Sequence, residues 1–407
     1  MLREMYVVDE LMGVGKTSAV INMLRPGRRA WGKRYIYVTP YLDEVKRVKR
    51  ECGFYEPGTY GTKTNGLRDL LRSRRCVVTT HALLSIIDTE TIRLIEDGNY
   101  SLVMDEALVP IEEAAFTTDD FDVVKKSKLI TIDDDGLLHW EKPKYKGDLA
   151  RLKRSCSEGS LIGIPHKSFW DAPVMWQLPP KVLKAFDQVY ILTYMFGGQL
   201  LKYYLDAYGF DYKYKYVRET EIGYELSDER SSHVRPKYGD LIHVIFDEEL
   251  NSIGDSDTAL SKSWYERGKN ATDARVCLKK WIDMAGRGQP TRVMWTTYKS
   301  EQAAMIRGRS APKKGFLSCN ARATNKFAGR DILAYMINRY MNVGIKTHLQ
   351  MRGVEIDEDE FALSEMLQWI FRSAVRNGEE IWIYIPSRRM RGLLLSWIKE
   401  VDGSATV

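Results

Sequence analysis

A glycine-rich turn stands between a short apolar run and a helical pattern near the start of the chain. The apolar run is Met5 to Val8, the turn is Gly13-Val-Gly-Lys-Thr-Ser18, and the helical pattern is Ala19 to Leu24. A strand, a glycine loop and a helix in this order bring several backbone N–H groups together beside the positive end of the helix. Such a turn binds phosphate, so the pattern predicts an α/β sheet with a phosphate site at its edge.

Each residue of this turn has an expected role. Lys16 would reach the β- and γ-phosphates, and the hydroxyl of Thr17 would bind Mg²⁺. The full pattern G-x-x-x-x-G-K-[ST] would place a glycine where this chain has Glu10. The alternative is a strand-to-helix turn without a ligand. The expected phosphate-binding residues are Gly13, Val14, Gly15, Lys16, Thr17 and Ser18.

A second candidate is the apolar run from Tyr100 to Met104, which ends in Asp105 and Glu106. A strand that ends in two carboxylates delivers them to the edge of the sheet where α/β proteins bind ligands. Asp105 would hold Mg²⁺, and Glu106 would orient or deprotonate an attacking water. An acidic turn after a buried strand is the alternative for an isolated pair, but the glycine-rich turn favours the catalytic interpretation.

The sequence between these two segments alternates strands with helices. Strand patterns cover 34–40 and 75–81, and helical patterns cover 42–52 and 82–87. With the strands near residues 5 and 103, this alternation predicts a parallel, doubly wound sheet.

Composition places the chain among globular proteins of more than one domain. Its 407 residues exceed the size of one ordinary domain, and 44% of them are hydrophobic. We find no apolar run long enough to cross a bilayer and expect a cytoplasmic protein without a membrane partner. The formal net charge of +6 fits a polyanionic partner but does not require one.

The order of these segments resembles that of phage-encoded superfamily 2 helicases and translocases of the DEAD/DEAH-like group. Residues 13–18 match motif I of that family, and Asp105-Glu-Ala107 matches motif II. Val38-Thr-Pro40 and Thr79-Thr-His81 are similar to motifs Ia and Ib, and Thr193 falls where motif III is expected. The resemblance implies ATP and Mg²⁺ as ligands. It also implies nucleic-acid contacts at Thr39, Pro40, Thr79, Thr80 and His81.

The C-terminal half continues the resemblance. Residues 291–298 are similar to motif IV and residues 316–325 to the motif V region. The first of these adds Thr296, Thr297 and Tyr298 as expected nucleic-acid contacts, with Tyr298 as a stacking candidate.

Gln368, Arg372 and Arg376 resemble motif VI, although the family pattern Q-x-x-G-R-x-x-R is here Q-x-x-x-R-x-x-x-R. The spacing of four predicts one polar stripe on a helix that runs through all three residues. The resemblance implies that these residues take part in catalysis and that one arginine neutralises charge on the γ-phosphate. Both Arg372 and Arg376 remain candidates for that role.

We therefore expect two tandem RecA-like (P-loop) domains of the α/β class with parallel sheets, at 1–217 and 236–407. The first would carry an insertion at about 108–188, in which alternating residues on either side of Asp134-Asp-Gly136 predict a β-hairpin.

The expected function is that of an ATP-dependent DNA helicase or translocase in phage replication or recombination. Its partners would be single-stranded or duplex DNA, with RNA left open, and other phage replication proteins. One alternative is the ATPase of a phage DNA-packaging motor of the terminase type, whose nuclease carboxylates would begin at Asp247, Glu248 and Glu249. A second is a nucleotide-gated adaptor that binds a replication or host protein without hydrolysis.

Overall fold

Two compact units make up the chain in the computed structural model. The first unit comprises Met1–Ser231 and Asn342–Ile356, and the second comprises Ser232–Met341 and Asp357–Val407. The first unit thus extends past residue 217, where we expected its end, and regains a segment from within the expected second domain. The structure describes residues 2–58, 62–84, 87–114, 116, 118–163, 174–231, 236–286, 288–321 and 325–404.

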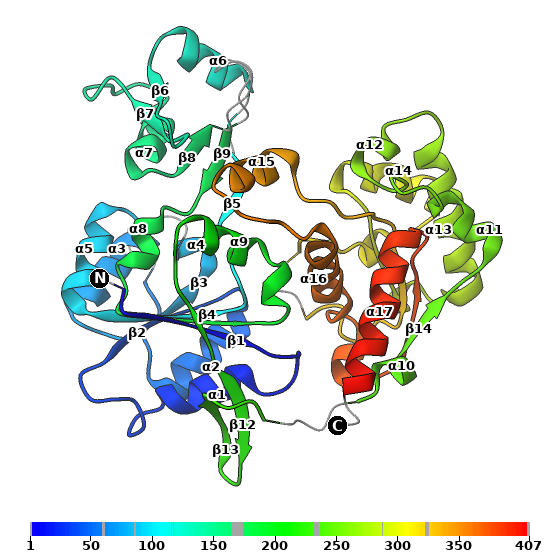
Figure 1. The fold of residues 1–407 in the computed structure, drawn as a ribbon, viewed down its shortest axis with the longest axis horizontal. Coiled ribbons are helices and arrows are strands. Elements are labelled where there is room, and N and C mark those ends of the chain that lie inside the picture. Colours follow the sequence, from blue (N-terminus) through cyan, green and yellow to red (C-terminus); the bar gives the residue numbers. More distant parts are fainter. Residues whose placement is uncertain are drawn as a thin grey trace. The chain divides into compact units, whose positions relative to one another are not determined.

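A six-stranded sheet forms the centre of the first unit (Figure 1). Its strand order is β11-β1-β10-β4-β2-β3, and every neighbouring pair is parallel. The strand before the glycine-rich turn, β1, and the strand that ends in Asp105, β4, are therefore separated by β10 alone. The strands are β1 (Glu4–Asp9), β2 (Arg34–Thr39), β3 (Val77–Thr80), β4 (Tyr100–Asp105), β10 (Gln188–Thr193) and β11 (Lys213–Tyr214).

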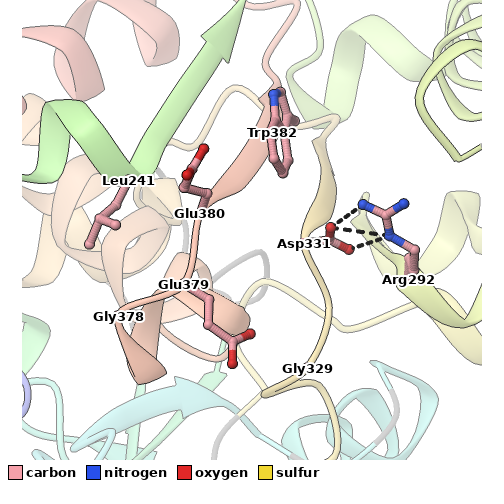
Figure 2. Close-up of a pocket in the computed structure, with 8 residues that line it drawn as sticks. All are labelled: Leu241, Arg292, Gly329, Asp331, Gly378, Glu379, Glu380 and Trp382. Carbon is pink, nitrogen blue, oxygen red and sulfur yellow. Dashed lines mark hydrogen bonds and ion pairs between the residues drawn. The ribbon is translucent and has the colours of Figure 1, made fainter.

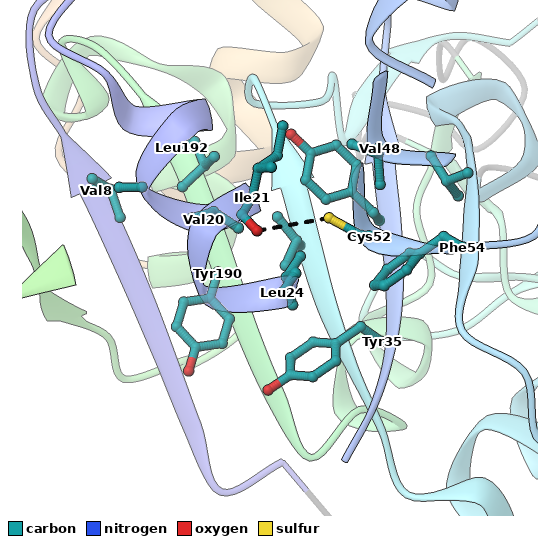
Figure 3. Close-up of a cluster of buried hydrophobic side chains, with 14 of the residues drawn as sticks. Val8, Val20, Ile21, Leu24, Tyr35, Val48, Cys52, Phe54, Tyr190 and Leu192 are labelled. Carbon is teal, nitrogen blue, oxygen red and sulfur yellow. Dashed lines mark hydrogen bonds between the residues drawn. The ribbon is translucent and has the colours of Figure 1, made fainter. Parts of the chain in front are cut away.

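Helices α1 and α2 pack on one face of this sheet through a buried apolar cluster (Figure 3). Val20, Ile21 and Leu24 of α1 meet side chains of the strands such as Tyr35 and Tyr190. Burial of this apolar stripe is the main force that holds a helix on a sheet. Outside the insertion, the described α-helices of the unit are α1 (Lys16–Leu24), α2 (Leu42–Cys52), α3 (Lys63–Arg72), α4 (His81–Leu84), α5 (Thr89–Gly98), α8 (Pro180–Lys184), α9 (Leu200–Ala207) and α15 (Val343–Met351).

The segment between β4 and β10 contains a small structure with its own apolar core. The expected hairpin is confirmed, because β6 and β7 pair antiparallel on either side of the turn at Gly136. A second, three-stranded sheet has the order β5-β9-β8. The elements are β5 (Ile111–Glu113), α6 (Thr118–Lys126), β6 (Ile130–Ile132), β7 (Leu138–Trp140), α7 (Ala150–Glu158), β8 (Leu161–Gly163) and β9 (Val174–Gln177).

Another antiparallel hairpin, β12 (Tyr216–Thr220) and β13 (Gly223–Ser227), follows the sheet and packs along α1. The returning helix α15 packs against α9, and Arg352 just after it lies 4.5 Å from the centre of the Tyr208 ring. Asn342, just before α15, donates a hydrogen bond of 3.0 Å to Glu113 in the insertion. These contacts attach the returning segment to the first unit.

The second unit contains a four-stranded parallel sheet in the order β14-β17-β16-β15. Both sheets are thus parallel and flanked by helices, and the expected α/β class is confirmed. No helix among the described residues is long and apolar enough to span a bilayer. The elements are α10 (Tyr238–Leu241), β14 (Ile242–Ile245), α11 (Glu248–Asn251), α12 (Lys262–Tyr265), α13 (Asn270–Gly286), β15 (Val293–Thr296), α14 (Gln302–Ile306), β16 (Ile332–Tyr335), α16 (Glu358–Ile370), β17 (Ile381–Tyr384) and α17 (Arg388–Ser404).

Gly254 lies in close contact with the backbone of Pro386 in the second unit. A Cβ atom at this position would collide with the backbone carbonyl of Pro386. We expect Gly254→Ala to lower the free energy of unfolding by about 3 kcal/mol, because backbone must move to admit the methyl group. Thermal denaturation measures the effect. Gly392→Ala, which meets no atom within 4 Å, is the control, and equal melting temperatures for the two variants would contradict the prediction.

Candidate functional site

The glycine-rich turn connects the end of β1 to the start of α1. Gly13 and Gly15 have φ values of 88° and 92°, which side chains rarely adopt. At Gly15 a second constraint applies, because a Cβ atom would lie 2.7 Å from the ring of Tyr224 on β13. The positive φ values give the turn a backbone path that glycine allows, and the missing side chain at Gly15 leaves room for the Tyr224 ring.

Lys16 is the first residue of α1, and its ammonium group turns back onto the loop. It donates hydrogen bonds to the carbonyl oxygens of Glu10 and Leu11, the latter at 2.8 Å. Burial lowers its pKa to about 8, although nearby carboxylates, Asp9 foremost, oppose this shift. A poorly hydrated ammonium held by loop carbonyls can exchange these partners for phosphate oxygens.

Thr17 and Asp105 meet at the carboxyl edge of the sheet. The hydroxyl of Thr17 donates a hydrogen bond of 3.0 Å to Oδ1 of Asp105, which is the last residue of β4 and 7% exposed. Burial and then the charge of Glu106 raise the pKa of Asp105 to about 6. The two predicted magnesium ligands are therefore adjacent.

Glu106 follows Asp105 in a left-handed backbone conformation, with φ of 71°. Its N–H donates to the carbonyl of Leu192 on β10 at 3.0 Å, and Oε1 accepts a hydrogen bond of 2.8 Å from the hydroxyl of Tyr41. The sequence analysis missed Tyr41. Its position directly after the Thr39-Pro40 strand end is the sequence feature that could have predicted Tyr41 as a site residue.

The donor set fits a triphosphate bound with Mg²⁺. Hydroxyl and carboxylate oxygens are ligands that Mg²⁺ prefers, and it commonly takes only one or two from the protein and the rest from phosphate and water. A buried carboxyl with a raised pKa is also a favourable place for a cation. Among the described residues, no three His, Cys, Asp or Glu side chains lie close enough to hold a metal by themselves. Thr17 and Asp105 would hold the ion, and the backbone of 13–18 would hold the phosphates.

Two other residues of the turn contribute differently. The hydroxyl of Ser18 accepts a hydrogen bond of 3.1 Å from Arg47 on α2, so its side chain braces α1 against α2. Val14 is half-buried, and only its backbone can serve a phosphate. Thr193, at the end of β10, exchanges hydrogen bonds with Gln199.

The predicted nucleic-acid contacts of the first unit follow β2 and β3, at the same edge of the sheet as Asp105. Thr39 and Thr79 have buried side chains, whereas Pro40, Thr80 and His81 are half-buried. The half-buried residues are the part of this group that a ligand can approach without rearrangement.

In the second unit, Thr296, Thr297 and Tyr298 lie at the carboxyl end of β15. Both threonines are fully buried, and the half-buried Tyr298 donates a hydrogen bond of 2.9 Å to the carbonyl of Asn338. Burial raises the pKa of Tyr298 to about 12, so the hydroxyl remains a donor at neutral pH. Residues 322–324 of the expected motif V region lie outside the described residues.

The single helix predicted through Gln368, Arg372 and Arg376 is wrong. Helix α16 ends at Ile370, and the chain continues as a turn and a short 3-10 helix, Ala374–Asn377. Ser373 causes the break, since its backbone is extended and its hydroxyl donates to the carbonyl of Ile370 at 2.6 Å. The three side chains therefore do not form one stripe.

Their surroundings also differ. Gln368 is half-buried on α16, and Arg372 is 5% exposed. Burial, followed by repulsion from Arg376, lowers the pKa of Arg372 to about 10. Arg376 is exposed and donates a hydrogen bond of 2.8 Å to Oδ1 of Asn325. Arg376 is thus the accessible cation of the pair.

The second unit also has a pocket of about 550 Å³ at the amino edge of its sheet (Figure 2). Arg292 and Asp331 form an ion pair on one side of the pocket, and Trp382 stacks with His243 beside it. None of the predicted site residues lines this pocket, so it is distinct from the glycine-rich turn and the Thr296 region. Its lining residues are Leu241, Arg292, Gly329, Asp331, Gly378, Glu379, Glu380 and Trp382.

The raised pKa of Asp105 predicts the effect of an isosteric substitution. A carboxyl whose pKa is higher in the folded than in the unfolded protein destabilises the fold above that pKa, and the cost disappears as the pH falls. We expect Asp105→Asn to stabilise the ligand-free protein at pH 7.5 by up to roughly 3 kcal/mol, because the amide avoids the buried charge and still accepts from Thr17.

Urea denaturation at pH 7.5 and at pH 4.5 measures this effect, and the gain should shrink at the lower pH. The exposed Asp97, at the end of α5, provides the matched control Asp97→Asn. An Asp105→Asn protein that is less stable than the wild type at both pH values would contradict the prediction.

Two solved structures are similar to this chain at a distance. One is an XPD helicase, with a TM-score of 0.48, 10% identity, and 99% of this chain and 95% of that chain covered. The other is the DUF1998 helicase MrfA bound to DNA and AMPPNP, with a TM-score of 0.36, 13% identity, and 98% of this chain and 48% of that chain covered. These similarities are too distant to add to the geometry of the site.

Sequence relatives are closer. The YonV C-terminal Rossmann-like domain matches residues 236–398, and the YonV middle domain matches residues 111–170, within the insertion. The SPbeta prophage-derived protein YonV of Bacillus subtilis (strain 168) is 35% identical over 413 residues, which cover 97% of this chain and 98% of that protein. Because the similarity extends over nearly the whole of both chains, this protein belongs to the YonV family.

Proposed function

We propose that this protein is a nucleoside triphosphatase that uses ATP and Mg²⁺ to move along DNA, as a helicase or translocase in phage replication or recombination. The observation that carries the proposal is the hydrogen bond of 3.0 Å between Thr17 and Asp105. It joins the phosphate-binding turn to the acidic strand end, which are the two halves of a nucleotide hydrolysis site. The prophage origin of YonV supports the phage context.

Each residue of the site has a role in this proposal. Lys16 would neutralise phosphate charge, and Thr17 and Asp105 would hold Mg²⁺, which stabilises negative charge on the phosphates. Glu106 would accept a proton from, or orient, the attacking water. Binding of DNA would involve Thr80, His81 and their neighbours at the same edge of the sheet, through hydrogen bonds to the phosphodiester backbone, with Pro40 in van der Waals contact.

The packaging motor is a weaker alternative. It requires a cluster of carboxylates that binds metal, and the side chain of Asp247 instead caps α11 by accepting from the N–H of Leu250 at 2.9 Å. Glu249 forms an ion pair with Lys280. An adaptor that binds a nucleotide without hydrolysis would have no need for Glu106 beside Asp105. A measurement of ATP turnover separates the two functions, because the adaptor would show none.

Substitutions in the turn and at the strand end test the proposal. We expect Lys16→Ala and Glu106→Gln each to reduce ATP turnover by about 100-fold or more, since each removes a group that acts on the transferring phosphate or the water. Turnover is measured at fixed salt with single-stranded DNA, duplex DNA or RNA, because the affinity for a polyanion depends on salt.

Lys49→Ala and Glu96→Gln, at exposed positions of α2 and α5, are matched controls that should retain full activity. Circular dichroism checks that all four variants fold. Near-wild-type turnover in folded Lys16→Ala or Glu106→Gln protein would refute the proposed site. No increase of wild-type turnover with any nucleic acid would refute the motor function.

We extend the proposal to Gln368, Arg372 and Arg376 as the contribution of the second unit to hydrolysis, with Arg376 as the arginine that acts on phosphate. Its exposed guanidinium is available to a ligand, whereas that of Arg372 is buried. We expect Arg376→Ala to lower turnover by about 100-fold or more with no change in melting temperature. Arg372→Ala should lower the melting temperature, because it removes a packed side chain from the core. The reverse pattern would assign the role to Arg372.

A further inference from the structure

Tyr41 connects the end of one strand to the proposed catalytic carboxylate on another. It comes two residues after Thr39, the last residue of β2, and directly precedes α2. Its N–H lies 3.3 Å from the hydroxyl oxygen of Thr39, and its side chain is half-buried. The phenol reaches the residue after β4, where its hydroxyl donates to Oε1 of Glu106 at 2.8 Å.

Both the backbone and the side chain of Glu106 form hydrogen bonds. Its backbone is in the left-handed region, which is unfavourable for a residue with a side chain and persists only where the surrounding structure imposes it. The hydrogen bond from its N–H to Leu192 attaches that backbone to β10. The hydrogen bond from Tyr41 adds a restraint on the position of the carboxylate.

This bond opposes the proposed role of Glu106. A carboxylate that accepts a hydrogen bond from a neighbour is a weaker acceptor for a second donor, and the bond from Tyr41 occupies one of its roughly four lone-pair sites. A base restrained in this way is less effective until the restraint is released.

The release can come from the nucleic acid. Tyr41 directly follows Pro40, which is half-buried and one of the expected contacts with nucleic acid, whereas the side chain of Thr39 before it is buried. A nucleic-acid strand bound to residues 39–41 would lie next to Tyr41, whose hydroxyl is hydrogen-bonded to Glu106. We propose that Tyr41 is a positioning residue that restrains Glu106 through its hydroxyl until nucleic acid engages residues 39–41, so that hydrolysis depends on the bound strand. This inference rests on the proposed function.

Tyr41→Phe removes the hydroxyl and retains the ring. The expected result is a rise of about 10-fold in kcat without nucleic acid, the size of effect that one hydrogen bond to a charged group exerts. With saturating single-stranded DNA, kcat should stay within about 2-fold of the wild type, since the restraint is already released there. KM for ATP should not change, because the hydroxyl touches no predicted phosphate ligand. The ratio of stimulated to unstimulated kcat would then fall by about 10-fold.

The matched control is Tyr212→Phe, which removes a hydroxyl that donates to the carboxylate of Asp206 at 3.2 Å. Tyr212 lies between α9 and β11 in the chain. It should leave both kcat values unchanged. Tyr41→Leu is a second variant without the hydroxyl, to be used should Tyr41→Phe fail to fold.

Two results would overturn the inference. One is an unstimulated kcat that does not rise in folded Tyr41→Phe protein. The other is a fall of both kcat values by the same factor, which would mean that Tyr41 supports the active arrangement or the fold. Failure of the proposed function would look different, since the wild type itself would then lack any turnover that Lys16→Ala removes.

Discussion

The hydrogen bond between Thr17 and Asp105 depends on the register of three strands. Asp9 of β1 pairs with Thr193 of β10, and Leu192 of β10 pairs with Asp105 of β4. These strands therefore end at one level, which allows the start of α1 to reach across the end of β10. A shift of one residue in either pairing would turn the carboxylate to the other face of the sheet and separate the two halves of the site.

The parts that the sequence predicted well are local. The glycine-rich turn, the Asp105-Glu106 strand end and the hairpin around Gly136 each carry their signal within a few residues. The break after Ile370 was missed because Ser373 stops the helix with its own hydroxyl inside a pattern that remains apolar at helical spacing. The contact between Tyr41 and Glu106 was missed because the two residues follow different strands, and the pairing of β2 with β4 cannot be predicted from either segment alone.

Negative charge predominates around Lys16 in the ligand-free protein. Asp9, Asp105, Glu10 and Glu106 all act on its pKa, and they outnumber the one ammonium group. A free triphosphate would be repelled by this excess of carboxylates, whereas its complex with a divalent cation would bring the missing positive charge. For the proposed triphosphatase, the balance of charge therefore favours the metal–nucleotide complex over the free triphosphate as the ligand.

The return of Asn342–Ile356 to the first unit has a consequence for how such proteins are inherited. A gene fragment that ends at residue 231 would encode the first unit without α15 and leave the Tyr208 side of α9 without its partner. Recombination can therefore exchange the first unit intact only if two separate stretches of coding sequence are transferred together. The interleaved chain favours transmission of the whole gene as one module.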